Sequence, residues 1–213
     1  MREPYFQNDL VTLYHGDCLD VTEWLTADVL VTDPPYGMNR AFGLDNLDYV
    51  ANDHSTQARD SALDLWGWDK PGIAFGHWKC ERPKKIRHSC VWDKGRMAMG
   101  DQSSAFATSH EEFYVFGNTK NFLDKREQSV IKFNMPAGHA RPDHPSAKPV
   151  GLMEHLIRKT GRGVVADPFA GSGSTLVAAR NLGRVSIGIE MEERYCELIA
   201  NRLSQEAFDF AGI

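Results

Sequence analysis

The chain of 213 residues is long enough for one α/β domain with a sizeable core. Its hydrophobic fraction of 42% and charged fraction of 25% are typical of a soluble globular protein, and no apolar run approaches the length that spans a membrane. A net charge of -5 argues against a simple basic coat on nucleic acid. Four scattered cysteines without C-x-x-C spacing predict reduced cytoplasmic thiols, with no metal site and no disulfide framework.

The first predicted strand, residues 10–14, runs into Gly16-Asp17-Cys18. An acid just past a strand end can face a ligand at the carboxyl edge of a sheet, which is one interpretation of Asp17. The other is that Asp17 caps a helix beginning near Leu19. Both interpretations stay open at the level of sequence.

The second predicted strand, residues 28–32, ends in Asp33-Pro34-Pro35-Tyr36. The two prolines hold the backbone extended, so that the carbonyl of Pro34 can point out of the chain. Asp33 adds a carboxylate beside that carbonyl, and Tyr36 adds a ring face. Two acceptors and a stacking surface suit a planar aromatic amine, whereas the plain alternative is a Pro-rich turn with an Asp cap.

The middle of the chain is less regular. Residues 57–68 predict an amphipathic helix with Ala62, Leu65 and Trp66 on its apolar face, and residues 38–69 are either a lid or a surface excursion. A strand at 72–75 precedes a basic cluster, which either contacts phosphates or is a solvated loop. The cluster consists of Lys79, Arg82, Lys84, Lys85, Arg87, Lys94 and Arg96.

A strand, a Gly-rich turn and a helix follow one another from Val164 to Ala179. The turn allows close backbone approach, and the helix start offers free N–H groups to a polar ligand. Glu190 ends the next strand about 20 residues on, where a Rossmann-type unit holds a ribose. An NTPase loop would need Lys in place of Gly173, and a dinucleotide fingerprint would need Gly in place of Leu176. The predicted nucleoside-cofactor residues here are Asp167, Pro168, Phe169, Gly171, Ser172, Gly173, Ser174 and Glu190.

These two stretches resemble the cofactor loop and the catalytic tetrapeptide of amino-methylating DNA methyltransferases. Because the tetrapeptide precedes the cofactor loop, the chain is similar to the circularly permuted, beta-type class of N6-adenine and N4-cytosine enzymes. The resemblance covers most of the chain and thins out at residues 38–70 and 118–140. It implies one Rossmann-like domain with a mostly parallel sheet and helices on both faces. It also implies S-adenosylmethionine as cofactor and double-stranded DNA as substrate. The implied location is the cytoplasm of a bacterial cell or of a phage-infected host.

The resemblance assigns further roles. Lys148, in a His-Pro-x-x-Lys-Pro element, is expected beside the methionine carboxylate of the cofactor, with Asp17, Cys18 and Asp33 also at the cofactor. Residues 118–141 are expected to be a short target-recognition insert, which favours a short site or a homodimer. The expected DNA contacts are Lys94, Arg96, His110, Lys120, Arg126 and Arg141.

The predicted reaction uses Asp33, Pro34, Pro35 and Tyr36 as its catalytic residues. Asp33 and the Pro34 carbonyl would hold the two N–H groups of a base amine, and Tyr36 would stack on the flipped base. No Pro-Cys dipeptide is present, so the covalent C5-cytosine reaction is set aside. Asp at the first tetrapeptide position resembles the N6-adenine enzymes. N4-cytosine, an RNA amine and a non-catalytic binding module stay as alternatives.

Overall fold

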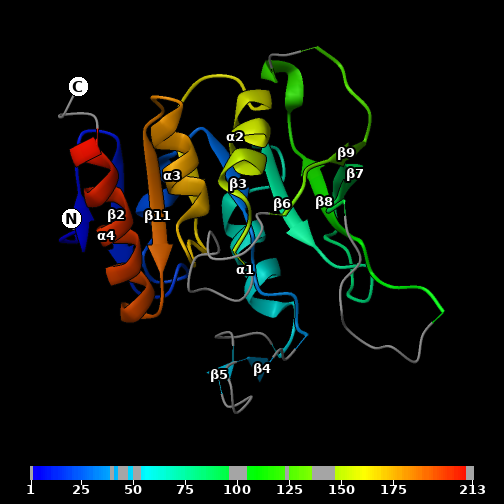
Figure 1. Cartoon of the computed structure of the whole chain (residues 1–213), viewed down its shortest axis with the longest axis horizontal. Helices are drawn as coiled ribbons and strands as arrows, with labels where there is room; N and C mark the ends of the chain where they lie inside the picture. Colours follow the sequence, from blue (N-terminus) through cyan, green and yellow to red (C-terminus); the bar gives the residue numbers. More distant parts are fainter. Residues whose placement is uncertain are drawn as a thin grey trace.

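The computed structural model describes residues 2–38, 41–42, 48–49, 54–95, 105–122, 125–135 and 147–209. Its main feature is a nine-stranded sheet in the order β1-β2-β11-β10-β3-β6-β8-β7-β9 (Figure 1). The strands of this sheet are β1 (Phe6–Gln7), β2 (Val11–His15), β3 (Val29–Thr32), β6 (Gly72–Gly76), β7 (Ile86–Asp93), β8 (His110–Phe116), β9 (Val130–Lys132), β10 (Val165–Asp167) and β11 (Ser186–Glu190). The other elements are β4 (Ala41–Phe42), β5 (Asp48–Tyr49), η1 (Glu23–Thr26), η2 (Thr119–Asn121), α1 (Gln57–Trp66), α2 (Val150–Lys159), α3 (Ser174–Asn181) and α4 (Glu193–Asp209).

The centre of the sheet is parallel, from β2 through β11, β10 and β3 to β6. Strand β8 then pairs antiparallel with both β6 and β7. The C-terminal strand β10 lies beside the N-terminal strand β3, so two segments far apart in sequence end at the same sheet edge. This edge, the carboxyl edge, is where ligands bind in open α/β sheets.

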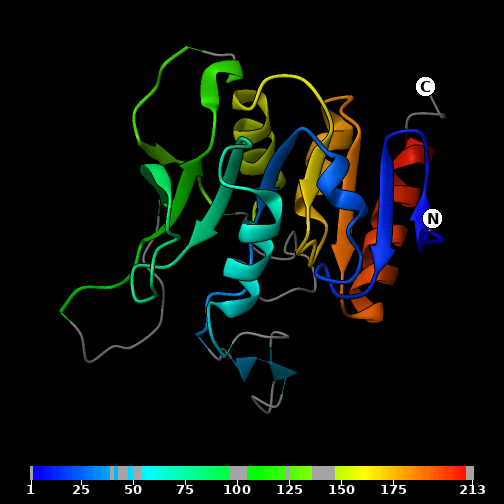
Figure 2. The same cartoon turned by 180° about the vertical axis from the view of Figure 1, so that it is seen from behind.

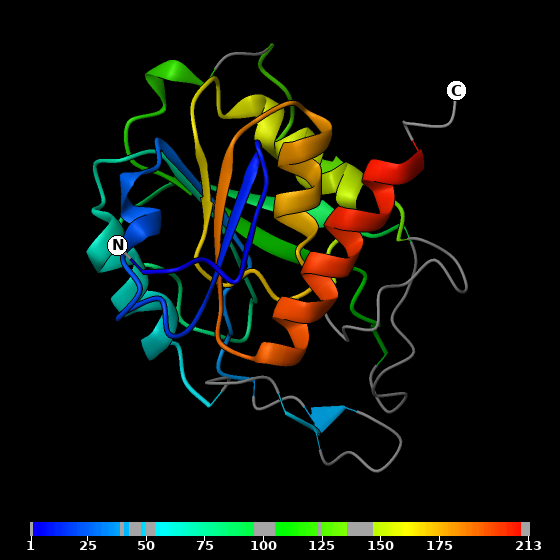
Figure 3. The ribbon, with the colours of Figure 1, turned by 90° about the vertical axis from the view of Figure 1, so that its left-hand side faces the viewer.

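Alternating side chains on β3 explain why helices cover both faces. Val29 and Val31 pack in the cluster that contains the α2 residues Leu152 and Leu156. Leu30 points the other way and packs with Trp24 and the α1 residues Ala62, Leu63 and Trp66. Figure 2, the view from behind, shows α1 and η1 in front of the sheet, and Figure 3 shows them on the side of the sheet opposite to α2, α3 and α4. The prediction of a mostly parallel sheet with helices on both faces is confirmed.

Two local predictions need correction. The segment after Asp17 is a turn in which the Asp17 carboxylate accepts the N–H of Leu19 at 2.9 Å, and the helical turn η1 begins only at Glu23. Helix α1 stops at Trp66 because Gly67 follows with φ 87°, and Leu65 is 47% exposed while Leu63 is buried.

Among the described residues, no helix is long and apolar enough to cross a membrane.

Candidate active site

A pocket at the carboxyl edge collects most of the predicted site residues. Strands β2, β3, β10 and β11 all lead into its walls. The predicted residues that line it are Asp17, Cys18, Asp33, Pro34, Pro35, Tyr36, Lys148, Asp167, Pro168, Phe169, Gly171, Ser172, Ser174 and Glu190. The two motifs, more than 130 residues apart in the chain, therefore share one cavity.

Gly173 lies behind the pocket wall and shapes the loop from there. It precedes α3 with φ 79°, in the left-handed region that favours glycine. A Cβ at this position would lie 2.8 Å from Ile199 Cγ1 on α4. The loop therefore needs glycine here both for its backbone conformation and for its close contact with α4.

Glu190 lines the pocket on the side of the Gly-rich loop. Its Oε2 accepts the N–H of Gly171 and its Oε1 accepts the N–H of Glu192, both at 2.7 Å. The residue is 8% exposed, and burial raises its pKa to about 7. The carboxyl group is thus fixed by backbone donors at the pocket wall and titrates near neutral pH.

Asp167 joins the two motifs structurally. Its Oδ1 accepts the hydroxyl of Thr32 at 2.6 Å and the N–H of Phe169 at 3.1 Å. Burial raises the pKa of Asp167 to about 6. Because Thr32 directly precedes Asp33, this bond fixes the end of β10 against the end of β3.

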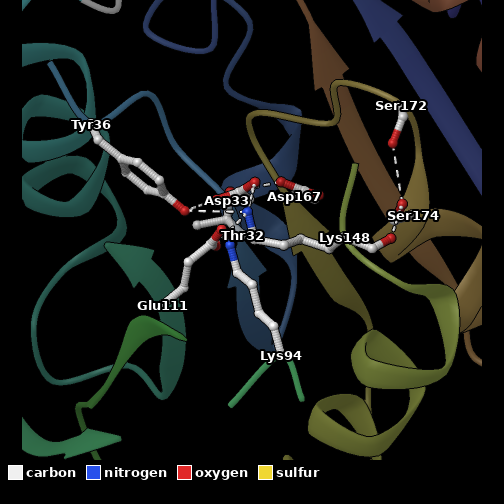
Figure 4. A network of polar contacts seen from close by, with 9 residues as sticks. All are labelled: Thr32, Asp33, Tyr36, Lys94, Glu111, Lys148, Asp167, Ser172 and Ser174. Carbon is white, nitrogen blue, oxygen red and sulfur yellow. Dashed lines mark hydrogen bonds and ion pairs between the residues drawn. The ribbon is translucent and has the colours of Figure 1, made fainter. Parts of the chain in front are cut away.

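The Gly-rich loop is also tied to the segment before α2. The hydroxyl of Ser174 donates to the carbonyl of Lys148 at 2.8 Å and lies 3.1 Å from the hydroxyl of Ser172 (Figure 4). On the other side, the Arg202 guanidinium donates to the Ser172 carbonyl. The loop is therefore anchored to neighbours on both sides.

Asp33 forms the opposite wall with its two oxygens engaged separately. The Tyr36 hydroxyl donates to Oδ1, and the ammonium of Lys148 forms an ion pair with Oδ2 (Figure 4). Burial raises the pKa of Asp33 against the opposing charge of Lys148. The Tyr36 ring is 8% exposed and lies 6.4 Å from the His77 ring, measured between centroids.

Sequence reasoning missed Glu111 as a member of this site. Its Oε1 lies 2.6 Å from Lys94 Nζ, and its Oε2 lies 3.1 Å from Lys148 Nζ. Burial alone would raise the pKa of Glu111, but the ammonium groups of Lys148 and Lys94 outweigh it and hold this pKa at about 2. The available signal was the pair Glu111-Glu112 at the start of a strand that continues as Phe113-Tyr114-Val115-Phe116.

The expected DNA contacts divide into three groups. Lys94 and His110 lie at the carboxyl edge, where Asp93 on β7 pairs with His110 on β8. Lys120 and Arg126 are exposed but do not come near the pocket, because β8 runs antiparallel and ends at the opposite edge. The N–H of Asn118 there donates to the carbonyl of Asp69, just before β6 begins.

Arg96 and Arg141 lie outside the described residues, as do residues 136–146, which include the start of the His-Pro-x-x-Lys-Pro element. The described part of the 118–141 insert is held to α2, since Glu127 pairs with His155 and with Lys159, each at 2.7 Å. Among the described residues, no group of three or more His, Cys, Asp or Glu side chains is placed to hold a metal ion.

Residues 73–202 match a family described as DNA methylase. The Type II methyltransferase M2.DpnII of Streptococcus pneumoniae is 45% identical, over 97% of this chain and 94% of the relative. The Type II methyltransferase M.ScaI of Streptomyces caespitosus is 27% identical, over 97% of this chain and 86% of the relative.

Two solved structures show the same fold. The complex of M1.HpyAVI with SAM superposes with a TM-score of 0.64 at 22% identity, over 91% of this chain and 99% of that chain. The cytosine-N4-specific PvuII DNA methyltransferase superposes with a TM-score of 0.71 at 15% identity, over 93% of this chain and 88% of that chain. The likeness therefore extends over nearly the whole α/β sheet.

Proposed function

The chain belongs to the DNA methylase family, and we propose that it is an S-adenosylmethionine-dependent methyltransferase acting on the exocyclic N6 of adenine in double-stranded DNA. The observation that carries the proposal is the shared pocket. The Asp33-Pro34-Pro35-Tyr36 turn and the Gly-rich loop meet there, with Glu190 at one end and Asp33 at the other. Such a pocket holds a nucleoside cofactor and a base amine side by side.

The residues of the pocket fit the cofactor. The Glu190 carboxyl, held by two backbone N–H groups, is placed to accept ribose hydroxyls. Pro168, Phe169 and Ile189 supply apolar wall for an adenine ring. When bound, S-adenosylmethionine supplies an electrophilic methyl group on a positively charged sulfur.

Asp33 and Pro34 act on the target amine. A carboxylate has about four lone-pair positions, and Tyr36 and Lys148 use two of those on Asp33, so Asp33 can still accept an N–H bond. The carbonyl of Pro34 accepts the second N–H. Holding both N–H groups turns the nitrogen lone pair toward the cofactor side, and Asp33 or water takes the released proton.

The base must leave the duplex to reach this carboxylate. Asp33 lies inside the pocket wall with a side chain 21% exposed, too deep for a base that stays stacked. The Tyr36 ring offers a stacking surface that offsets part of the unstacking free energy, which is a few kcal/mol. A homodimer would add DNA contacts from a second subunit.

Aspartate at the first tetrapeptide position supports adenine as the target. N4 of cytosine is the alternative, and it keeps the same chemistry because its amine also carries two N–H groups and a delocalised lone pair. The PvuII enzyme, with the same fold, is cytosine-N4-specific.

The test is direct product identification. The protein is incubated with S-adenosylmethionine and unmethylated duplex DNA, the DNA is digested to nucleosides, and the product is identified by mass spectrometry. We expect N6-methyldeoxyadenosine. N4-methyldeoxycytidine would overturn the base assignment alone, whereas no product in the presence of demonstrated S-adenosylmethionine binding would favour a non-catalytic module.

A further inference from the structure

Four charged side chains alternate in sign beside the target-amine site (Figure 4). Lys94 follows β7, Glu111 lies on β8, Lys148 precedes α2, and Asp33 follows β3. Lys94 contacts Glu111 at 2.6 Å, Glu111 contacts Lys148 at 3.1 Å, and Lys148 contacts Asp33. Four separate segments of the chain thus converge on one row of charges that ends at the catalytic carboxylate.

The inner charges of this row are buried. The side chain of Lys148 is 4% exposed and that of Glu111 is 10% exposed, so solvent screens them weakly. Glu111 Oε2 makes no hydrogen bond within the described part of the chain, so the ion pair with Lys148 is its compensation. Removing Lys148 would leave the buried Oε2 of Glu111 without this ion pair, although Oε1 would still contact Lys94, and that loss is unfavourable.

We propose that Lys148 and Glu111 are positioning residues that set the charge and the acceptor strength of Asp33. The ammonium of Lys148 favours the ionised form of Asp33 and holds its Oδ2 in an ion pair. Glu111 also pairs with the Lys148 ammonium, and its negative charge therefore weakens the stabilising effect of Lys148 on ionised Asp33. The inference deepens the proposed methyl transfer and rests on it, because it concerns the carboxylate that receives the amine.

The effect of each charge on Asp33 has a definite sign. The Lys148 ammonium lowers the pKa of Asp33 against the raising effect of burial, and the Glu111 carboxylate raises it further. The Tyr36 hydroxyl also lowers it by hydrogen bonding. The ionisable groups facing Asp33, directly or through one or two neighbours, are Lys148, Glu111, Lys94, Tyr36, Asp167 and His77.

Replacing Lys148 and replacing Glu111 should therefore shift the titration of Asp33 in opposite directions. Lys148→Met removes the cation and raises the pKa of Asp33, whereas Glu111→Gln removes the competing anion and lowers it. A nearby opposite charge such as Lys148 lowers the pKa of a carboxyl by about one unit or more, and a nearby like charge such as Glu111 raises it. A residue that only packs against its neighbours would not give opposite signs.

The matched control is Glu112→Gln. Glu112 is the next residue on β8 and is 7% exposed against 8% for Glu111. It pairs with Arg82 at 2.9 Å and accepts the Tyr114 hydroxyl, away from the row of charges. Its replacement also removes a buried negative charge from the same strand, but not from the surroundings of Asp33.

The experiment has two readouts. The Asp33 carboxyl is titrated by carbon-13 NMR in the free protein, and the acid limb of kcat for DNA methylation is measured at saturating S-adenosylmethionine. Relative to the wild-type protein, we expect the pKa from NMR and the pKa of the acid limb to rise by about one unit or more in Lys148→Met. Both pKa values should fall in Glu111→Gln and remain unchanged in Glu112→Gln. The isosteric Glu111→Gln variant decides the question alone if Lys148→Met does not fold.

Shifts of the same sign in both variants, or none in Glu111→Gln, would overturn the proposal. So would an unchanged titration of Asp33 in Lys148→Met together with a weaker Kd for S-adenosylmethionine, since Lys148 would then serve the cofactor carboxylate alone. The NMR readout needs no turnover. A failure of the proposed function would appear as absent methylation by the wild-type protein, with the titration of Asp33 still measurable.

Discussion

The two walls of the pocket are built in different ways. On the side of the Gly-rich loop, backbone N–H groups of Gly171 and Glu192 donate to Glu190, and the N–H of Phe169 donates to Asp167 together with the Thr32 hydroxyl. On the side of Asp33, the contacts join side chains to one another, from Tyr36 and Lys148 to Asp33 and from Lys148 to Glu111.

This difference predicts different sensitivities. A wall made of backbone groups depends on chain conformation, so a misplaced Cβ should damage it more than a change of charge. A wall made of paired side chains depends on charge, so an isosteric replacement that keeps the shape should still disable it.

The largest expected effect is that of Asp33→Asn. The side chain keeps its shape but loses its charge and half of its acceptor capacity, so we expect kcat to fall by about 10²- to 10³-fold. The Kd for S-adenosylmethionine, measured by calorimetry, should stay at the wild-type value because the Gly-rich loop is untouched. Wild-type turnover by this variant would disprove the assigned role of Asp33.

The backbone-built wall is tested by Gly173→Ala. Alanine at φ 79° is strained, and its Cβ would lie 2.8 Å from Ile199 Cγ1. We expect the free energy of unfolding to fall by about 2 to 4 kcal/mol from strain and overpacking together. The Kd for S-adenosylmethionine should rise as the loop shifts.

Gly183→Ala is the control for backbone strain alone. Gly183 has φ 64°, but a Cβ there meets nothing within 4 Å. We expect a loss of only about 1 to 2 kcal/mol in urea unfolding, with no change in cofactor affinity. Equal losses in the two variants would show that the contact with Ile199 contributes nothing.

The sequence predicted the backbone-built wall more completely than the side-chain wall. The cofactor loop is one contiguous stretch, and Glu190 follows at a fixed spacing, so the information is local. Glu111 joins Lys148 only because β8 lies antiparallel beside β6, a pairing between distant segments that no local pattern specifies.

The antiparallel direction of β8 also explains why the position of residues 118–141 relative to the pocket could not be predicted from the sequence. Position in the chain suggested that residues 118–141 face the DNA. Strand β8 begins at the carboxyl edge with His110 and ends at the other edge with Phe116, so η2 starts far from Asp33. Of the two interpretations left open for Asp17, the helix cap near Leu19 was wrong for a different reason: the Asp17 carboxylate stabilises a turn as readily as a helix start.

A moderate effect is expected from pH on the backbone-built wall. Burial raises the pKa of Glu190 to about 7, so the group is largely protonated at pH 6 and largely ionised at pH 8. Only the ionised form accepts two ribose hydroxyls with both oxygens. The Kd for S-adenosylmethionine should therefore fall as pH rises through about 7, and Glu190→Gln should remove this dependence. A pH-independent Kd in the wild-type protein would contradict the assignment.

The smallest expected effects concern single surface cations at the two edges of the sheet. Lys79 is exposed just beyond the carboxyl end of β6, with its ammonium 5.2 Å from the Trp78 ring, whereas Lys120 is exposed at the opposite edge. If DNA binds over the pocket, Lys79→Ala should weaken binding and reduce the slope of log K against log salt by about 0.9, the value of one phosphate contact. Lys120→Ala should leave both unchanged. Binding is measured by fluorescence anisotropy over a salt series. Equal losses of affinity in the two variants would mean that DNA contacts both edges of the sheet, including the 118–141 insert.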